Sequence, residues 1–273
     1  LDPGDEVVLL APYWVTYPAQ VQLAGGVPVA VATQPEDGFV PDLEAVRAAF
    51  SERTKAVGIN SPSNPTGAVY PREVVAGIVE MAAERGLWIF ADDLYEHLIY
   101  EGSFTSAASY AQDNTLIIHG ASKAYALTGW RIGYGAGPRE LIKAMNRLQG
   151  QSTSGANTLA QHAVTAALNE VDKTRAFIDM TKRAYVERRD LLVAGLNRLG
   201  LATPNPQGAF YAMADLTAIH QDEEEAALML LEQANVAVVP GTDFLAPGQA
   251  RFSYATSLEN IATALERIER LLD

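Results

Sequence analysis

Residues 55–92, KAVGINSPSNPTGAVYPREVVAGIVEMAAERGLWIFAD, hold two short apolar runs on either side of one amphipathic segment. The runs Lys55–Asn60 and Leu87–Asp92 are short and rich in apolar residues, as buried strands are. Between them, Arg72–Arg85 places apolar residues at intervals of three and four, directly after Pro71, and proline is tolerated at a helix start. This pattern predicts two parallel strands joined by a crossover helix.

The same alternation continues on both sides of this unit. Further strands are expected at Val7–Ala11, Val27–Ala32 and Thr115–Gly120, and a further crossover helix at Asp42–Arg53, after Pro41. After Tyr134 the sequence changes to long helical stretches, which are Arg139–Gln149, Asn157–Asn169 and Lys173–Leu199. The last part predicts strands at Ala209–Met213, Val236–Val239 and Arg251–Tyr254 and a closing helix at Leu258–Leu272.

These elements predict an α/β fold of two unequal domains. We expect a large domain at residues 1–185, with a mostly parallel sheet covered by helices, and a smaller α+β domain at residues 186–273. The acidic run at residues 222–225 is expected to begin a solvated helix, because the helix dipole favours negative charge there.

Composition narrows the classes of function. The chain has 273 residues, 20 Lys and Arg against 33 Asp and Glu, and a net charge of −13, which repels phosphate backbones and anionic lipids. Nucleic acid is therefore not an expected partner. No apolar run approaches the roughly 18 residues that span a bilayer, so no membrane is expected either. The absence of cysteine agrees with a reducing cytoplasm, which is the expected location.

Two kinds of catalytic site find no support in the sequence. The four histidines, His97, His119, His162 and His220, show no spacing typical of metal ligands, so no metal site is expected. No G-x-S-x-G segment is present, which argues against a serine hydrolase of the α/β type.

In open α/β sheets ligands bind beyond the carboxyl ends of the strands. Several residues with reactive or ligand-binding side chains follow the predicted strands. Lys123 follows Thr115–Gly120, and partial burial would lower the pKa of its amine and make it a nucleophile. Asp92 ends an apolar strand and needs a cationic or hydrogen-bonding partner, such as a protonated pyridine nitrogen. Tyr95 and Asn64 could both bond a ring oxygen of the same ligand.

Three further side chains suit an aromatic, anionic ligand. Arg131 lies in a glycine-rich stretch where a guanidinium could bind phosphate, and Arg251 could clamp a carboxylate. Trp14, after the first strand, could stack on an aromatic ring. Each of these residues alone also fits a structural role: a solvated lysine, a helix cap at Asp92, a surface ion pair at Arg251, or core packing at Trp14.

Taken together, the motifs resemble the fold-type I aminotransferases that depend on pyridoxal phosphate, and most closely the bacterial aspartate aminotransferases. They are Asn64-Pro65-Thr66-Gly67, Asp92-x-x-Tyr95, Ser122-Lys123 followed by Gly129-Trp130-Arg131-x-Gly133, and Arg251. Any one motif is a weak signal, but four in the right order and spacing are specific, and the resemblance runs over essentially the whole chain.

The resemblance implies a role for each residue. Lys123 would form a Schiff base with pyridoxal 5′-phosphate and shuttle a proton, while Asp92 would keep the ring nitrogen protonated. Tyr95 and Asn64 would bond the ring oxygen, and Trp14 would stack on the ring. Ser122 and Arg131 would hold the phosphate. Arg251, with Trp14 and Asn64, would bind the substrate. A cis peptide before Pro65 is also implied.

The expected reaction is amino transfer between an L-amino acid, aspartate as the first choice, and a 2-oxo acid, 2-oxoglutarate, in a homodimer. Chains of the family carry roughly a hundred residues before the point that matches Leu1, including a helix N-terminus that binds the phosphate. Three alternatives therefore stay open: a β-lyase of the C–S lyase type on the same scaffold, a catalytically impaired fragment, and a non-catalytic regulatory module.

Overall fold

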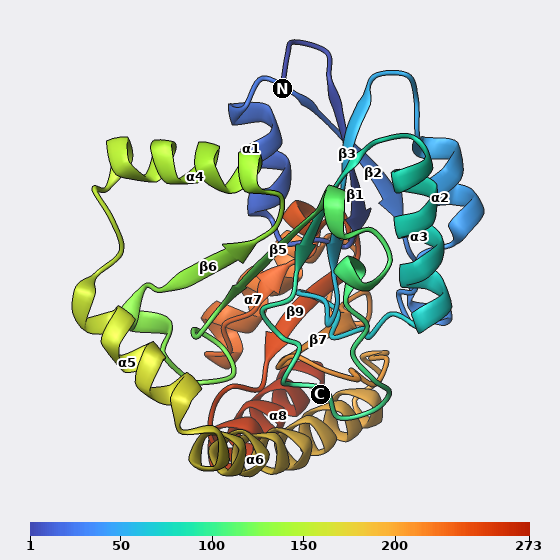
Figure 1. Cartoon of the computed structure of the whole chain (residues 1–273). Helices are drawn as coiled ribbons and strands as arrows, with labels where there is room; N and C mark the ends of the chain where they lie inside the picture. The colour runs from blue at the N-terminus through green and yellow to red at the C-terminus, as the bar shows by residue number, and fades with distance from the viewer.

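The computed structural model describes residues 1–273, and its first lobe is built on a six-stranded sheet in the order β2-β1-β3-β4-β5-β6 (Figure 1). All neighbouring strands are parallel except β5 and β6. The strands are β1 (Glu6–Ala11), β2 (Val27–Ala32), β3 (Thr54–Asn60), β4 (Trp88–Asp92), β5 (Thr115–Gly120) and β6 (Gly133–Ala136). The α/β fold and the five parallel strands predicted from the sequence are thus confirmed.

Strand β6 was not predicted. Its four residues, GYGA, include two glycines and show no alternation of apolar and polar residues, so local sequence gives no strand signal. It forms by pairing antiparallel with β5, with His119 opposite Tyr134. The long-range partner, and not local propensity, determines this strand.

Most predicted helices agree with the structure to within three residues at each end, and two places differ more. The helices are α1 (Thr16–Leu23), α2 (Leu43–Ala49), α3 (Arg72–Glu84), α4 (Arg139–Ser152), α5 (Thr158–Asn169), α6 (Val171–Arg198), α7 (Glu223–Ala234) and α8 (Leu258–Leu272). Helix α1 was missed because it buries only Val21 and so lacks an apolar stripe. Helix α2 ends before the predicted Arg53, since Phe50 adopts an extended backbone conformation. The acidic run does begin α7, whose first amides are capped by the Asp222 side chain.

The second lobe holds a three-stranded sheet in the order β7-β9-β8. Its strands are β7 (Tyr211–Asp215), β8 (Val239–Pro240) and β9 (Gln249–Ser253). The predicted strand Val236–Val239 is wrong except for its last residue. Val236 is apolar because it packs into the core of the second lobe, not because it pairs with a strand.

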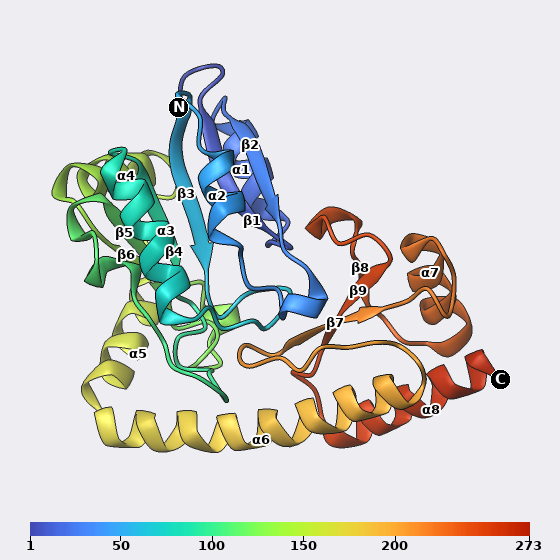
Figure 2. The same ribbon diagram turned by 90° about the vertical axis from the view of Figure 1, so that its right-hand side faces the viewer.

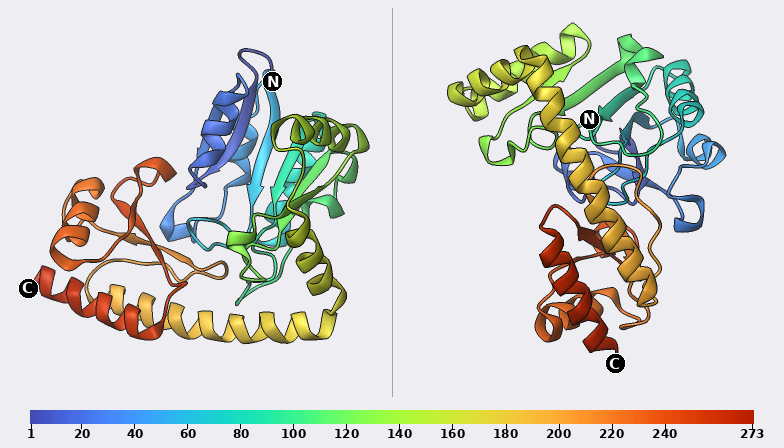
Figure 3. Two further views of the ribbon diagram at one scale, coloured as in Figure 1. Left: turned by 90° about the vertical axis from the view of Figure 1, so that its left-hand side faces the viewer. Right: turned by 90° about the horizontal axis from the view of Figure 1, so that it is seen from below.

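Helix α6 runs beneath both lobes and joins them (Figure 2). Seen from below, it extends from the end of α5 to α8, beside which it packs (Figure 3). The two cores also exchange residues: Tyr95 and Leu98 of the first lobe lie in the core of the second, and Met213 and Phe244 lie in the core of the first. The proposed domain boundary between residues 185 and 186 falls inside α6 and stays a prediction.

Alternate residues of the first sheet face two different cores. Val8, Val57 and Ile89 point into a large cluster with α2 and α3, whereas Val7 and Leu9 belong to a small cluster with α1. A cleft of about 800 Å³ opens on the α1 face and reaches Tyr17 and Asp92. No helix is both long and apolar enough to cross a membrane.

Candidate active site

The carboxyl ends of β3 and β4 lie side by side and bring Asn60 and Asp92 into register. The Asn60 side chain donates to the Asp92 backbone carbonyl at 2.9 Å, and its own oxygen accepts from the Asn64 amide N–H at 2.8 Å. The peptide bond from Asn64 to Pro65 is cis, as the resemblance implied. Asn60 therefore ties the loop containing Asn64 to the end of β4, where Asp92 lies.

The Asp92 carboxylate is held by hydrogen bonds and has no lysine or arginine in ion-pair contact. The Tyr17 hydroxyl donates to Oδ2, and the Leu94 amide donates to Oδ1 at 3.3 Å. Burial raises the pKa of Asp92, while the bond from Tyr17 opposes that rise. A cation beside this carboxylate would stabilise its charged form, so the position suits a protonated ring nitrogen.

Lys123 presents an amine without an acidic partner. Its side chain is half-buried, and no carboxylate lies within ion-pair distance of Nζ. The Nζ atom lies 5.9 Å from the ring centroid of Tyr95 and 5.8 Å from that of Phe210. Burial lowers the pKa of Lys123, and the charge of Asp92 partly offsets this effect. A larger share of the amine is therefore uncharged and nucleophilic than in a solvated lysine.

Arg251, on β9, reaches from the second lobe to the first. Its Nη1 donates to the Asn64 side-chain oxygen at 2.8 Å, and its guanidinium lies 4.5 Å from the Tyr211 ring and 5.1 Å from the Phe244 ring. The Nε atom is buried without a hydrogen-bond partner. A buried donor without an acceptor is costly, and a carboxylate bound to the fork would satisfy it.

Two aromatic side chains of the predicted site lie nearby in different environments. Tyr95 is buried and donates its hydroxyl hydrogen to the Tyr211 hydroxyl at 3.2 Å, and burial raises its pKa well above the usual range. Trp14 remains 37% exposed and packs edge-on against Tyr17, with 5.4 Å between ring centroids. The indole therefore keeps surface free for contact with a ligand.

Ser122 and Arg131 make no hydrogen bond to the other residues of the site. Arg131 is exposed, adopts a left-handed backbone conformation with φ of 53°, and donates from Nη1 to the Thr128 carbonyl at 2.9 Å. Its charge still contributes to lowering the pKa of Lys123, so the two cations lie near each other. The partly buried Ser122 makes no side-chain hydrogen bond. Both residues keep donors free for an anion.

Three residues of the site were missed by the sequence analysis: Tyr17, Asn60 and Tyr211. Tyr17 follows Trp14 by three residues, the spacing of one helical turn, which could have indicated a shared site. Asn60 ends a predicted strand next to the one that Asp92 ends, so register alone could have paired them. No local signal marks Tyr211, because only the packing of the second lobe on the first brings it to Tyr95 and Arg251.

Replacing Asn60 by alanine should lower the free energy of unfolding by about 1–3 kcal/mol, because the buried Asn64 amide loses its acceptor. Urea denaturation of the purified variant measures this loss. The matched control is Asn169→Ala, at an exposed residue whose side chain makes no hydrogen bond, and it should change stability by less than about 0.5 kcal/mol. Equal effects of the two substitutions would contradict the role given to Asn60.

Comparison with known proteins shows which family the chain matches. Residues 1–268 match the family described as "Aminotransferase class I and II". The chain is similar to the aspartate/prephenate aminotransferase of Thermus thermophilus, with 54% identity over 272 residues that cover all of this chain and 70% of that protein.

Solved structures agree. The aspartate aminotransferase of Thermus thermophilus with maleate superimposes with a TM-score of 0.97 at 54% identity, over 99% of this chain and 71% of that one. An aromatic aminotransferase of Pyrococcus horikoshii gives a TM-score of 0.95 at 36% identity, over 100% and 74% of the two chains. The match over nearly the whole sequence and the agreement in fold show that this chain is a member of the class I and II aminotransferase family.

Proposed function

We propose that the protein binds pyridoxal 5′-phosphate and transfers the amino group of L-aspartate to 2-oxoglutarate. The observation that carries the proposal is the half-buried amine of Lys123, which has no acidic partner while its pKa responds to both Asp92 and Arg251. A nucleophile (Lys123), a buried acid (Asp92) and a guanidinium that can bind a carboxylate (Arg251) thus lie close enough together to act on one ligand. This is the set of groups that amino transfer on an α-amino acid needs.

The residues present fit this cofactor on grounds that do not depend on the relatives. The Asp92 carboxylate is buried enough for its pKa to rise, yet forms no ion pair, which suits a pyridinium nitrogen. Trp14 offers exposed ring surface for stacking, and Ser122 and Arg131 offer free donors for a phosphate. Tyr95 and Asn64 supply polar groups for the ring oxygen, and Lys123 supplies the atom of covalent attachment.

The chemistry that pyridoxal phosphate supplies when bound is an aldehyde that accepts amino groups and a ring that withdraws electrons. The side chains of this protein do the rest. Arg251 binds the α-carboxylate of the substrate and fixes its orientation, and Asn64, hydrogen-bonded to Arg251, holds that guanidinium in place. Lys123, with its lowered pKa, would take the proton from the substrate Cα and deliver it to the carbon that was the aldehyde carbon of the cofactor. Asp92 would hold the ring nitrogen, and the positive charge of that nitrogen would favour the charged form of the carboxylate.

Aspartate is the proposed amino donor for two reasons. The similar protein of Thermus thermophilus is named an aspartate/prephenate aminotransferase, and the similar solved structure is an aspartate aminotransferase of Thermus thermophilus with maleate. Both aspartate and 2-oxoglutarate have the α-carboxylate that Arg251 would bind. We further propose that the protein acts as a cytoplasmic homodimer. The family resemblance supports the dimer, and the absence of cysteine is compatible with the cytoplasm. Gel filtration with light scattering tests the dimer.

Product analysis with the cofactor-loaded protein tests the reaction. Aspartate alone should yield oxaloacetate in an amount equal to the enzyme, and turnover should begin only when 2-oxoglutarate is added. Continuous release of ammonia and a 2-oxo acid from an amino acid alone would instead identify a β-lyase. Failure to bind cofactor at any concentration would identify the chain as a catalytically impaired fragment. Either result would overturn the proposal.

A further inference from the structure

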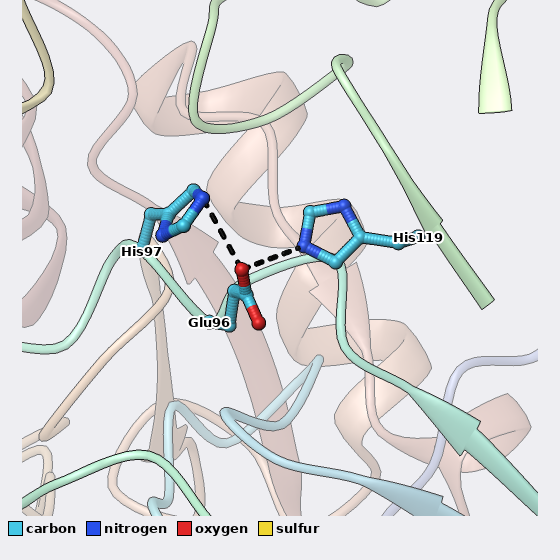
Figure 4. Close-up of side chains that lie close together, drawn as sticks. All are labelled: Glu96, His97 and His119. Carbon is cyan, nitrogen blue, oxygen red and sulfur yellow. Dashed lines mark ion pairs between the residues drawn. The ribbon is translucent and has the colours of Figure 1, made fainter. Parts of the chain in front are cut away.

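Glu96, His97 and His119 form a cluster beside the candidate active site that the proposed reaction does not use (Figure 4). Glu96 and His97 lie in the turn after β4, and His119 lies in β5. One carboxylate oxygen, Glu96 Oε1, is 3.2 Å from His97 Nε2 and 3.3 Å from His119 Nε2. The two imidazole rings therefore direct a nitrogen each toward the same oxygen.

The buried member of the cluster points a nitrogen into it. His119 is only 5% exposed, and its Nε2 is buried without a hydrogen bond of acceptable geometry. Its other nitrogen, Nδ1, accepts from the Gly120 amide at 2.7 Å and lies 3.0 Å from the Tyr134 hydroxyl. The Tyr134 ring stacks on the imidazole at 5.2 Å between centroids, which holds the ring orientation. Nε2 is thus presented to Glu96 by a well-supported side chain.

We propose that Glu96, His97 and His119 bind one divalent transition-metal ion, with Zn²⁺ as the best fit. Zinc binds imidazole nitrogen and carboxylate oxygen at about 2.0–2.2 Å, so tetrahedral ligands lie roughly 3.3 Å apart. The two spacings from Glu96 Oε1 match this value. The three ligand atoms all lie within 4.8 Å of one another, and the half-exposed His97 ring, which makes no hydrogen bond outside the cluster, can turn to close the widest spacing.

The ligand atoms and the opening to the surface indicate which kind of ion the cluster would bind. Two imidazoles with one carboxylate favour zinc and its transition-metal neighbours over Mg²⁺ and Ca²⁺, which prefer oxygen ligands alone. A pocket of about 500 Å³ borders Glu96 and His97 and is also lined by Asp179, Arg175 and Lys182, so an ion can enter from the surface and a water molecule can complete its coordination.

Binding requires the His119 proton to move. With Nε2 on the metal, Nδ1 carries the proton and donates it to Tyr134 Oη, and the contact with the Gly120 amide is lost. Glu96 supplies one negative charge toward the two positive charges of the ion, and its only ion-pair contacts are with the two histidines. Spacing along the chain could not have indicated this site, because the two histidines are 22 positions apart and only the pairing of β4 with β5 brings them together.

Titration of ZnCl₂ into the cofactor-free 273-residue protein, followed by calorimetry, tests the site. One ion per chain should bind, and Co²⁺ at the same position should give the visible absorption of a tetrahedral complex. His97→Gln and His119→Asn should each weaken binding at least about 10-fold. His97 is half-exposed, so its substitution leaves the fold intact even if the His119 variant unfolds, as circular dichroism would reveal.

The matched control is His220→Gln, which removes an exposed histidine far from the cluster in sequence and should leave the affinity unchanged. Absence of saturable zinc binding by the unmodified protein would overturn the proposal. Equal affinities of the unmodified protein and the His97 variant would also overturn it, because the ion would then be held by surface carboxylates. Neither result depends on whether the protein transfers amino groups.

Discussion

Replacing Lys123 by alanine should reduce the rate of amino transfer by more than about 10⁴-fold. A single residue that moves a proton contributes roughly 10²–10⁴-fold, and Lys123 is also the proposed attachment point of the cofactor, so its loss should exceed that range. The fold should survive, because the side chain is only half-buried and makes no ion pair. Steady-state assays with aspartate and 2-oxoglutarate measure the effect.

Lys143→Ala is the matched control for this substitution. Lys143 is an exposed lysine of α4 whose only ion pair is with Glu140, one turn away, and its removal should leave the rate unchanged. Addition of methylamine should restore part of the activity of the Lys123 variant and none of that of an unfolded protein. A Lys123 variant within tenfold of the unmodified enzyme would contradict the assigned proton transfer.

Replacing Arg251 by glutamine should lower kcat/KM by about 30- to 4,000-fold for both aspartate and 2-oxoglutarate. Removal of one partner from a buried, hydrogen-bonded charge pair costs about 2–5 kcal/mol, and each 1.4 kcal/mol corresponds to tenfold. Both substrates should be affected alike, because both carry the α-carboxylate that this guanidinium would bind. Most of the loss should appear in KM and little in the affinity for the cofactor.

The control for this second substitution is Arg267→Gln. Arg267 donates to the Asn235 carbonyl on the exposed surface, so its loss should change neither kinetic constant. If the Arg251 variant lost cofactor and substrate affinity in equal measure, the residue would act by supporting the contact between the lobes through Asn64, Tyr211 and Phe244 instead.

Much of the fold could be predicted because most of its parallel strands are largely buried and its crossover helix α3 has an apolar stripe. The strand at β4 has an apolar run ending in Asp92, and α3 has a clear helical spacing. Elements without these signals were missed or misplaced. Helix α1 buries a single residue, β6 consists mainly of glycine and small residues, and Val236 is apolar for packing outside a strand.

The candidate site was predictable where chemistry and strand ends coincide, as at Asp92 and Lys123. The structure brings Asn64 to Arg251 and gives Lys123 a pKa that responds to Asp92, Arg131 and Arg251. Contacts that depend on two lobes or on two strands could not be obtained from the local pattern. Tyr211 beside Tyr95, and His97 beside His119, are brought together only by tertiary structure.

The central claim is that the amine of Lys123 is the nucleophile of the site, and covalent trapping tests it most directly. The protein is incubated with pyridoxal 5′-phosphate, reduced with borohydride and digested, and the peptides are analysed by mass spectrometry. The account predicts that the reduced cofactor is found on Lys123 in a one-to-one ratio with the chain. Label spread over the exposed lysines, with Lys123 unmodified, would contradict it.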